Sequence, residues 1–195
     1  SATGTPPLII GAHFDHLGHG EAHNSLATDE EKGDIHRGAD DNASGVAALI
    51  EIARFLQSKR SGFKRDVIVA AWSGEELGLL GSHAFVKNRR AAAYLNLDMV
   101  GRLREKLQIA GFAPSSDWDN VVSSATKTRN LDIERVATPF VPSDASSFYS
   151  ADIPVLSFTT GAHAEYHTPR DTAEKLNYPG LAAITSLVAD VAFRI

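Results

Sequence analysis

The chain has 195 residues, a length that fits one domain with a single substantial core. Its net charge of −5 argues against a nucleic-acid partner, because such proteins present clustered lysine and arginine. No apolar run approaches the ~20 residues that a membrane-spanning helix needs, so we expect a soluble protein without a membrane span. The absence of cysteine excludes disulfides, cysteine-rich zinc sites and thiol nucleophiles.

The first seven residues, SATGTPP, have neither the basic start nor the apolar core of a signal peptide. We expect them to be a linker or the edge of the segment. Residues 8–195 are predicted to form one domain. The sequence gives no indication of the oligomeric state.

Apolar runs and helical periodicity alternate along the chain. Continuous apolar runs predict buried strands at residues 8–12, 67–72, 91–97 and 153–158, and residues 107–111 are expected to add a short strand. We expect the 67–72 strand to be central and covered on both faces. Apolar residues at helical spacing predict helices over residues 44–58, 77–88, 116–128 and 179–193. The polar segments 17–37, 138–151 and 160–172 are predicted to be loops, the second with one helical turn.

Strands separated by helices imply right-handed βαβ units and a mostly parallel central sheet. With helices on both faces, the expected fold is an α/β three-layer sandwich. Ligands in such folds bind beyond the C-terminal ends of the strands. The chemically reactive residues of this chain fall at those ends: His13, Asp15, Asp40, Asp41, Glu75, Glu76, Asp98 and His167.

The segment from Gly38 to Gly45, GADDNASG, places two adjacent aspartates directly before an apolar helix. Aspartates also suit helix N-termini, so a purely capping role is one interpretation. The strand-end residues as a group offer imidazole and carboxylate but no thiolate, a donor set that suits Zn²⁺, Mn²⁺ or Co²⁺. Two histidines and three carboxylates exceed the ligands of one open catalytic zinc, and they fit two ions that share a carboxylate.

Five blocks of this sequence resemble the M28 family of co-catalytic zinc peptidases, which are chiefly aminopeptidases. They are His13-Phe14-Asp15, Gly38 to Gly45, Ser73-Gly74-Glu75-Glu76, Asn96-Leu97-Asp98 and Tyr166 to Thr172, in the family's order. The resemblance implies a zinc-exopeptidase fold. Family members usually have a helix and further strand material before the first histidine, so we expect this sheet to lack one or two N-terminal edge elements.

The resemblance also implies a role for each matching residue. Asp41 would bridge two zinc ions, with Glu76 and His167 completing one set of ligands and His13 and Asp98 the other. Glu75 would be the general base, and Tyr166 would stabilise the developing oxyanion. Asp15 would hydrogen-bond the far nitrogen of His13, and Asp40 would support the loop. The family's cis peptide would here join Asp41 and Asn42.

The function expected from the resemblance is a metal-dependent exopeptidase acting on peptides, in the first place an aminopeptidase. A carboxypeptidase or dipeptidase is an alternative, with Arg170 or Arg102 holding a substrate carboxylate. A single-zinc enzyme of the glutaminyl-cyclase kind and a non-catalytic binding domain of the same fold are further alternatives. The resemblance implies a secreted protein, in an extracellular or periplasmic location.

The other histidines and one motif have no clear counterpart in the M28 family's sequence blocks. We expect His16, His19, His23 and His36 to be solvated loop residues, one of which could line a substrate entrance. His163 is expected to be a loop hydrogen-bonding residue without a further role. Ser143-Asp144-Ala145 departs from related sequences, which often carry histidine after Ser-Asp, and this leaves the wall near Phe148 undefined.

Overall fold

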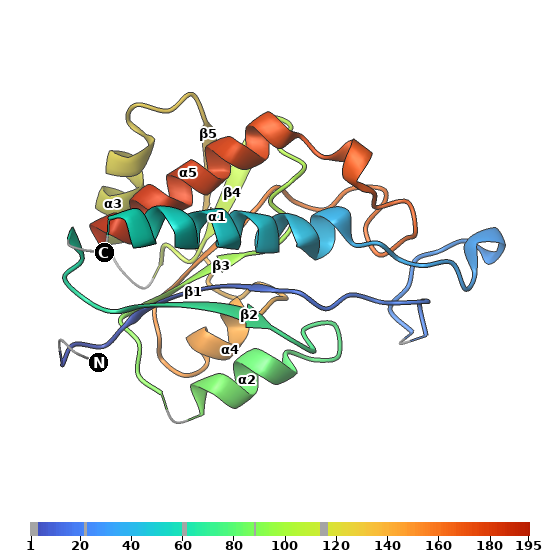
Figure 1. Cartoon of the computed structure of the whole chain (residues 1–195), viewed down its shortest axis with the longest axis horizontal. Helices are drawn as coiled ribbons and strands as arrows, with labels where there is room; N and C mark the ends of the chain where they lie inside the picture. Colours follow the sequence, from blue (N-terminus) through green and yellow to red (C-terminus); the bar gives the residue numbers. More distant parts are fainter. Residues whose placement is uncertain (1–3, 22, 60–61, 88, 114–116) are drawn as a thin grey trace.

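The computed structural model describes the chain except residues 1–3, 22, 60–61, 88 and 114–116 (Figure 1). Within the described residues a six-stranded sheet has the order β2-β1-β3-β6-β4-β5. The strands are β1 (Leu8–His13), β2 (Val67–Trp72), β3 (Ala93–Leu97), β4 (Lys106–Ala110), β5 (Asp132–Val136) and β6 (Val155–Thr159). Every neighbouring pair is parallel except β4 with β6. The sheet is therefore mixed but mostly parallel, as predicted.

Helices cover both faces of this sheet. One face carries α1 (Gly45–Ser58), α3 (Asp117–Thr126) and α5 (Tyr178–Arg194), and the other carries α2 (Leu80–Val86) and α4 (Ala145–Tyr149) (Figure 1). The apolar stripes of α1 and α5 pack on the sheet with residues such as Ile52 and Val188, both fully buried. A second core, which includes Tyr94 and Phe148, lies under α2 and α4. This arrangement confirms the predicted three-layer α/β fold.

Three elements differ from the sequence prediction. The strand β2 lies at the edge of the sheet, with the side chain of Val69 40% exposed, and is not central. Strand order depends on how the crossover connections close, which an apolar run does not encode. The edge strand β5 was not predicted, because it is short, charged and mostly exposed. The helix α2 begins at Leu80 rather than Leu77, since Gly74 and Gly78 turn the chain with φ of 72° and 105°.

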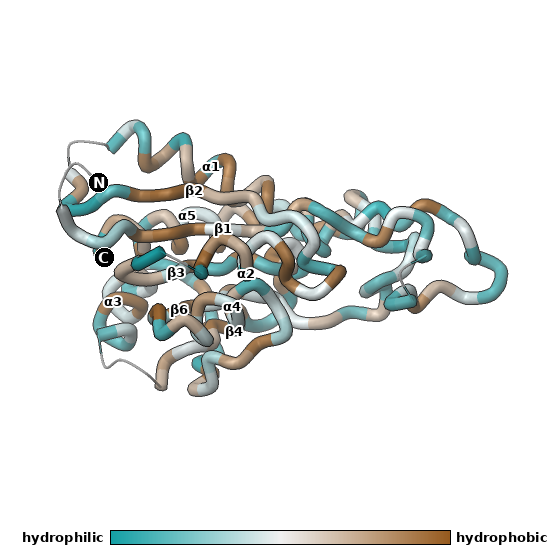
Figure 2. The backbone as a smooth tube through the Cα atoms, turned by 90° about the horizontal axis from the view of Figure 1, so that it is seen from below, coloured by the Kyte–Doolittle hydropathy of each residue, from teal (hydrophilic) through white to brown (hydrophobic). Residues whose placement is uncertain are grey.

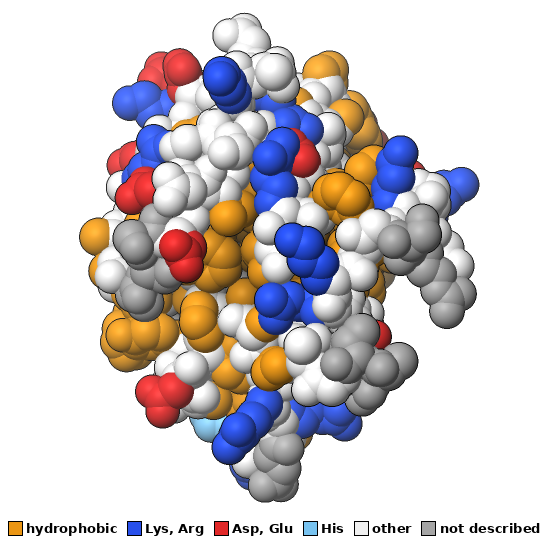
Figure 3. Space-filling view, turned by 90° about the vertical axis from the view of Figure 1, so that its left-hand side faces the viewer, with side chains coloured by type: hydrophobic (Ala, Val, Ile, Leu, Met, Phe, Trp, Pro, Cys, Tyr) orange, Lys and Arg blue, Asp and Glu red, His pale blue; other side chains and the backbone are white. Residues whose placement is uncertain are grey.

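The C-terminal ends of β1, β2, β3 and β6 lie at one end of the sheet because these strands run in the same direction. The long loop, residues 17–37, extends from that end and is largely hydrophilic (Figure 2). At the opposite end, which carries the two termini, lysine and arginine side chains form a band across the surface (Figure 3). The described helices include no candidate for a membrane span.

Candidate metal centre

The GADDNASG segment forms a kinked turn over Ala39–Ser44, in which the backbone at Asp41 and Asn42 is not helical, and it leads directly into α1. Gly38 precedes it in the left-handed region with φ of 56°. A Cβ at Gly38 would collide with the carbonyl oxygen of Asp41 and with the ring of His16. Glycine is therefore required both by the backbone conformation and by the lack of space for a side chain. The peptide bond between Asp41 and Asn42 is cis, as predicted.

Asp41 lies between two histidines that come from opposite ends of the chain. Its Oδ1 is 3.3 Å from Nε2 of His13, which is the last residue of β1. Its Oδ2 is 3.2 Å from Nε2 of His167, which lies in the loop after β6. All three side chains are buried. Each carboxylate oxygen thus faces a different imidazole nitrogen, which is the geometry that a bridging carboxylate needs.

The remaining predicted ligands extend this arrangement into two halves. Asp98 follows β3, and its Oδ1 lies 3.5 Å from Nε2 of His13. Glu76 follows β2, and its Oε2 lies 3.2 Å from Nε2 of His167. We call the pair His13 and Asp98 the Asp98 half and the pair His167 and Glu76 the Glu76 half.

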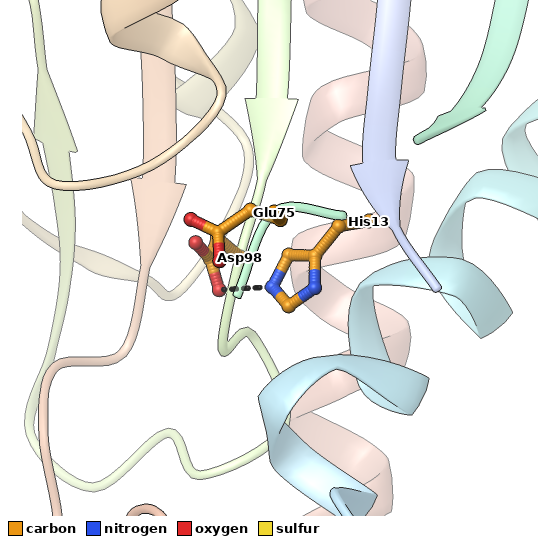
Figure 4. Close-up of side chains that lie close together, drawn as sticks. All are labelled: His13, Glu75 and Asp98. Carbon is orange, nitrogen blue, oxygen red and sulfur yellow. Dashed lines mark ion pairs between the residues drawn. The ribbon is translucent and has the colours of Figure 1, made fainter. Parts of the chain in front are cut away.

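Glu75 belongs to the Asp98 half by position. Figure 4 shows His13, Glu75 and Asp98 turned toward one another, with an ion pair between His13 and Asp98. One ligand atom from each of these three residues lies within 4.8 Å of the others. The imidazole nitrogens and carboxylate oxygens gathered here are the donors that zinc accepts in proteins, so the residues present fit such an ion.

Asp15 contacts His13 differently from the prediction. Nδ1 of His13 donates a hydrogen bond to the carbonyl oxygen of Asp15 at 3.1 Å, whereas the Asp15 carboxylate lies 3.8 Å away. That carboxylate accepts the backbone N–H groups of Glu75 and Glu76, each at 3.2 Å. Asp15 therefore ties the end of β1 to the turn that carries both glutamates.

Asp40 is fully buried and makes contacts suited to supporting the loop. Its Oδ1 accepts the backbone N–H of Gly101 at 2.6 Å and the hydroxyl of Ser44 at 3.0 Å. Its Oδ2 lies 3.2 Å from Nε2 of His163, whose other nitrogen is 3.3 Å from Glu165. The buried ring of His163 therefore lies between the carboxylates of Asp40 and Glu165, and no motif around His163 indicated this position.

Two loop histidines were wrongly predicted to be solvated. Nδ1 of His16 lies 2.8 Å from Oε1 of Glu76, and the His16 side chain is only 10% exposed. His36 is buried and accepts a hydrogen bond from the hydroxyl of Ser25 at 2.8 Å. The sequence feature that could have indicated a place for His16 in the site is that it directly follows Asp15. His19 and His23 are exposed, as expected.

The crowding of charges changes the protonation of these groups in the metal-free protein. Burial opposes protonation of His13, but its contacts with Asp41 and Asp98 prevail and raise its pKa to about 12. The pKa of His167 rises to about 10 against the effect of burial, through Asp41 and Glu76. Burial raises the pKa of Glu75 to about 8, with His13 opposing and nearby carboxylates adding to the shift. The cluster therefore holds protons that cations could replace.

A cavity of about 440 Å³ opens onto the Asp98 half. Its polar lining includes Glu75 and Tyr166, and its apolar wall includes Met99, Val141 and Pro142. The ring of Tyr166 stacks on His167 with centroids 3.8 Å apart. Burial, and then the surrounding carboxylates, raise the pKa of Tyr166, so its hydroxyl stays protonated and can donate a hydrogen bond.

The two arginines considered as carboxylate-binding residues are already paired. Arg102 contacts Glu165 at 2.5 Å and is largely buried, and Arg170 is paired with Glu31. Among the described residues, no lysine or arginine lines the cavity.

Fold and site together define an α/β protein with a cluster of histidines and carboxylates, a donor set that fits a metal ion, at the C-terminal ends of parallel strands. The chain belongs to peptidase family M28, whose sequence pattern matches residues 1–192. This confirms the family suggested by the five sequence blocks.

Individual relatives agree with this assignment. Aminopeptidase YwaD of Bacillus subtilis (strain 168) is 32% identical over 166 residues, which are 77% of this chain and 36% of that protein. The uncharacterized protein YfbL of Escherichia coli (strain K12) is 28% identical over 216 residues, covering 92% of this chain and 64% of that protein. The chain therefore spans less than two thirds of the length of either relative.

Solved structures share the fold. The crystal structure of the LapA aminopeptidase of Legionella pneumophila aligns with a TM-score of 0.77 at 22% identity, over 96% of this chain and 50% of that one. The likeness at this identity is one of fold.

Proposed function

We propose that residues 8–195 form a single catalytic domain of a di-zinc exopeptidase, and that it removes N-terminal residues from peptides. The observation that carries the proposal is the position of Asp41, whose two oxygens face His13 and His167 separately. A carboxylate so placed suits two cations and would be redundant for one.

The two halves of the centre would each hold one ion together with Asp41. The Asp98 half would supply His13 and Asp98, and the Glu76 half would supply His167 and Glu76. When bound, zinc would polarise the scissile carbonyl and lower the pKa of the attacking water. Mn²⁺ or Co²⁺ suit the same donors.

Glu75 would act as the general base. It is adjacent to Glu76 in the chain, lines the cavity and lies beside the Asp98 half. A carboxylate there takes a proton from the attacking water and returns it to the departing amine. Its raised pKa in the metal-free protein reflects burial, and bound cations would favour the ionised form that a base requires.

Tyr166 would stabilise the oxyanion that forms on the carbonyl oxygen. Its hydroxyl remains protonated, and the residue lines the same cavity as Glu75. A donor in this position stabilises the negative charge that develops on the carbonyl oxygen during attack.

The charge of the cavity favours an aminopeptidase over a carboxypeptidase. A substrate's α-ammonium group would meet the carboxylates of Glu75 and Asp98, which both line the cavity. A substrate's carboxylate would meet no lysine or arginine among the described lining residues, since Arg102 and Arg170 are engaged elsewhere.

A panel of matched peptides tests this function. The zinc-loaded protein should cleave amino-acid amides and peptides with a free N-terminus and leave their N-acetylated counterparts intact. Removal of metal by a chelator should abolish cleavage, and zinc should restore it. Cleavage of N-acetylated peptides at a free C-terminus would instead establish a carboxypeptidase.

Zinc analysis separates the remaining alternatives. Two bound ions without hydrolysis of any peptide would indicate a binding domain, and a single ion with cyclisation of N-terminal glutamine would indicate the glutaminyl-cyclase kind of chemistry. We also propose an extracellular or periplasmic location, from the family resemblance alone. Fractionation of cells that express the full-length protein tests this location.

A further inference from the structure

The long loop returns to the metal centre and contacts His167 on two sides. Nδ1 of His167 donates a hydrogen bond to the backbone carbonyl of Asn24 at 2.8 Å. The backbone N–H of Leu26 donates to the carbonyl of His167, also at 2.8 Å. Because Nδ1 carries the proton of this bond, a neutral His167 presents the lone pair of Nε2 toward Asp41 and Glu76.

The carboxylate of Glu76 is held at both oxygens. Nδ1 of His16 lies 2.8 Å from Oε1, and the side-chain amide of Asn24 donates to Oε2 at 3.2 Å. The same amide also reaches the backbone carbonyl of Glu76 at 3.3 Å. The carboxylate is thus fixed in orientation by two side chains that the predicted ligand set does not include.

His16 is itself held in place by the segment that carries the bridging aspartate. Its ring packs against Gly38, where a Cβ would come within 2.7 Å of the ring carbons Cγ and Cδ2. It also makes an edge contact with the ring of His167, with centroids 5.9 Å apart. A buried imidazole between Gly38, Glu76 and His167 has little freedom to turn, so its hydrogen bond to Glu76 is directed by packing.

The Asp98 half has no comparable support from this region. Nδ1 of His13 donates to the backbone of Asp15, two residues along the same strand end. Among the described residues from His16 to Arg37, no hydrogen bond or ion pair reaches His13 or Asp98. The support is therefore confined to one half of the centre.

We propose that His16 and Asn24 are positioning residues that raise the affinity of the Glu76 half for its zinc ion and leave the Asp98 half unchanged. The inference rests on the proposed di-zinc function. Partners that orient a ligand in this way typically contribute a factor of roughly 10–100 to metal affinity.

Competitive zinc titration against a chromophoric chelator, which resolves the two dissociation constants, tests the proposal. His16→Leu keeps bulk but removes the donor, and Asn24→Ala removes the amide while keeping the backbone carbonyl that His167 uses. Both variants should weaken one site roughly 10–100-fold and leave the other within about twofold. The weakened site should be the one that His167→Ala loses and His13→Ala keeps.

Two further variants separate the hydrogen bond from general packing. His16→Asn retains an N–H donor near the Nδ1 position and should recover most of the affinity. His19→Leu is the matched control, because His19 is exposed and bonds only to the carbonyl of Gly33 in the described structure, and it should leave both sites unchanged. The absorption spectrum of the Co²⁺-loaded protein should change in His16→Leu and not in His19→Leu.

The outcomes are distinct. A wild-type protein that binds fewer than two ions refutes the proposed function and this inference with it. Two ions with unchanged affinities in both His16→Leu and Asn24→Ala refute the inference alone, as does equal weakening of both sites. If His16→Leu fails to fold, by urea unfolding of the metal-free protein, Asn24→Ala and His16→Asn decide the matter.

Discussion

Asp171 accepts the backbone N–H of Asp41 through its Oδ2 at 3.0 Å, and both side chains are buried. The same oxygen accepts the N–H of Asp40 at 2.8 Å. A carboxyl oxygen from a residue 130 positions later in the chain thus fixes the backbone of Asp41, the residue that faces both histidines. Position 171 lies in the last sequence block, where only His167 and Tyr166 were assigned roles.

Asp171→Ala should destabilise the protein by about 2–5 kcal/mol, because it leaves two buried N–H groups without an acceptor. Urea unfolding of the metal-free protein measures this loss. Asp171→Asn keeps one carbonyl oxygen and should lose less. A midpoint of Asp171→Ala equal to that of the wild type would mean that the N–H groups find another acceptor.

Glu75→Gln should keep both zinc ions and lower kcat by about 10²–10⁴-fold, since it removes the base and leaves the five ligands in place. Metal analysis and steady-state hydrolysis of an amino-acid amide measure the two effects. Glu51→Gln is a matched surface control, because in the described part of the chain Glu51 pairs with Arg54 at exposed positions of α1. Normal turnover by Glu75→Gln would remove Glu75 from the mechanism.

Tyr166→Phe distinguishes oxyanion stabilisation from simple packing. Phenylalanine keeps the stacked ring on His167 but lacks the hydroxyl. If the hydroxyl serves the transition state, kcat should fall by about 10²-fold or more while KM changes little. An unchanged kcat would leave Tyr166 with a packing role only.

Zinc binding should release protons at pH 7.5. Both His13 and His167 have pKa values raised far above 6.5, to about 12 and about 10, so the metal-free protein carries both protons at this pH. Each histidine must lose its proton to bind a cation, so apparent zinc affinity should rise as pH rises from 6 to 9.

Calorimetric titration in buffers of different ionisation enthalpy measures the number of protons released. Each histidine should contribute about one, and Glu75, whose pKa of about 8 leaves it mostly protonated at pH 7.5, should add most of a third. The variant His167→Ala should release about one fewer. Release of less than one proton in the wild type would mean that the histidines are neutral before the metal arrives.

The sequence by itself determined the layers of the fold, and its resemblance to the M28 family implied the ligand set that we propose. Apolar runs and helical periodicity predicted five of the six described strands and four of the helices, because burial of one face leaves a regular pattern in the chain. The placement of His13, Asp41, Glu76, Asp98 and His167 at strand ends followed from the parallel topology, which brings those ends together. In the structure these five residues do converge.

Only the tertiary structure decided how the centre is held. The contacts of His16 with Glu76, of Asn24 with His167 and of Asp171 with Asp41 join residues 60, 143 and 130 positions apart. Sequence periodicity does not indicate such pairings, because each depends on where a loop without regular structure packs against the rest of the domain. The edge position of β2 was decided in the same way, by the order in which the strands assemble.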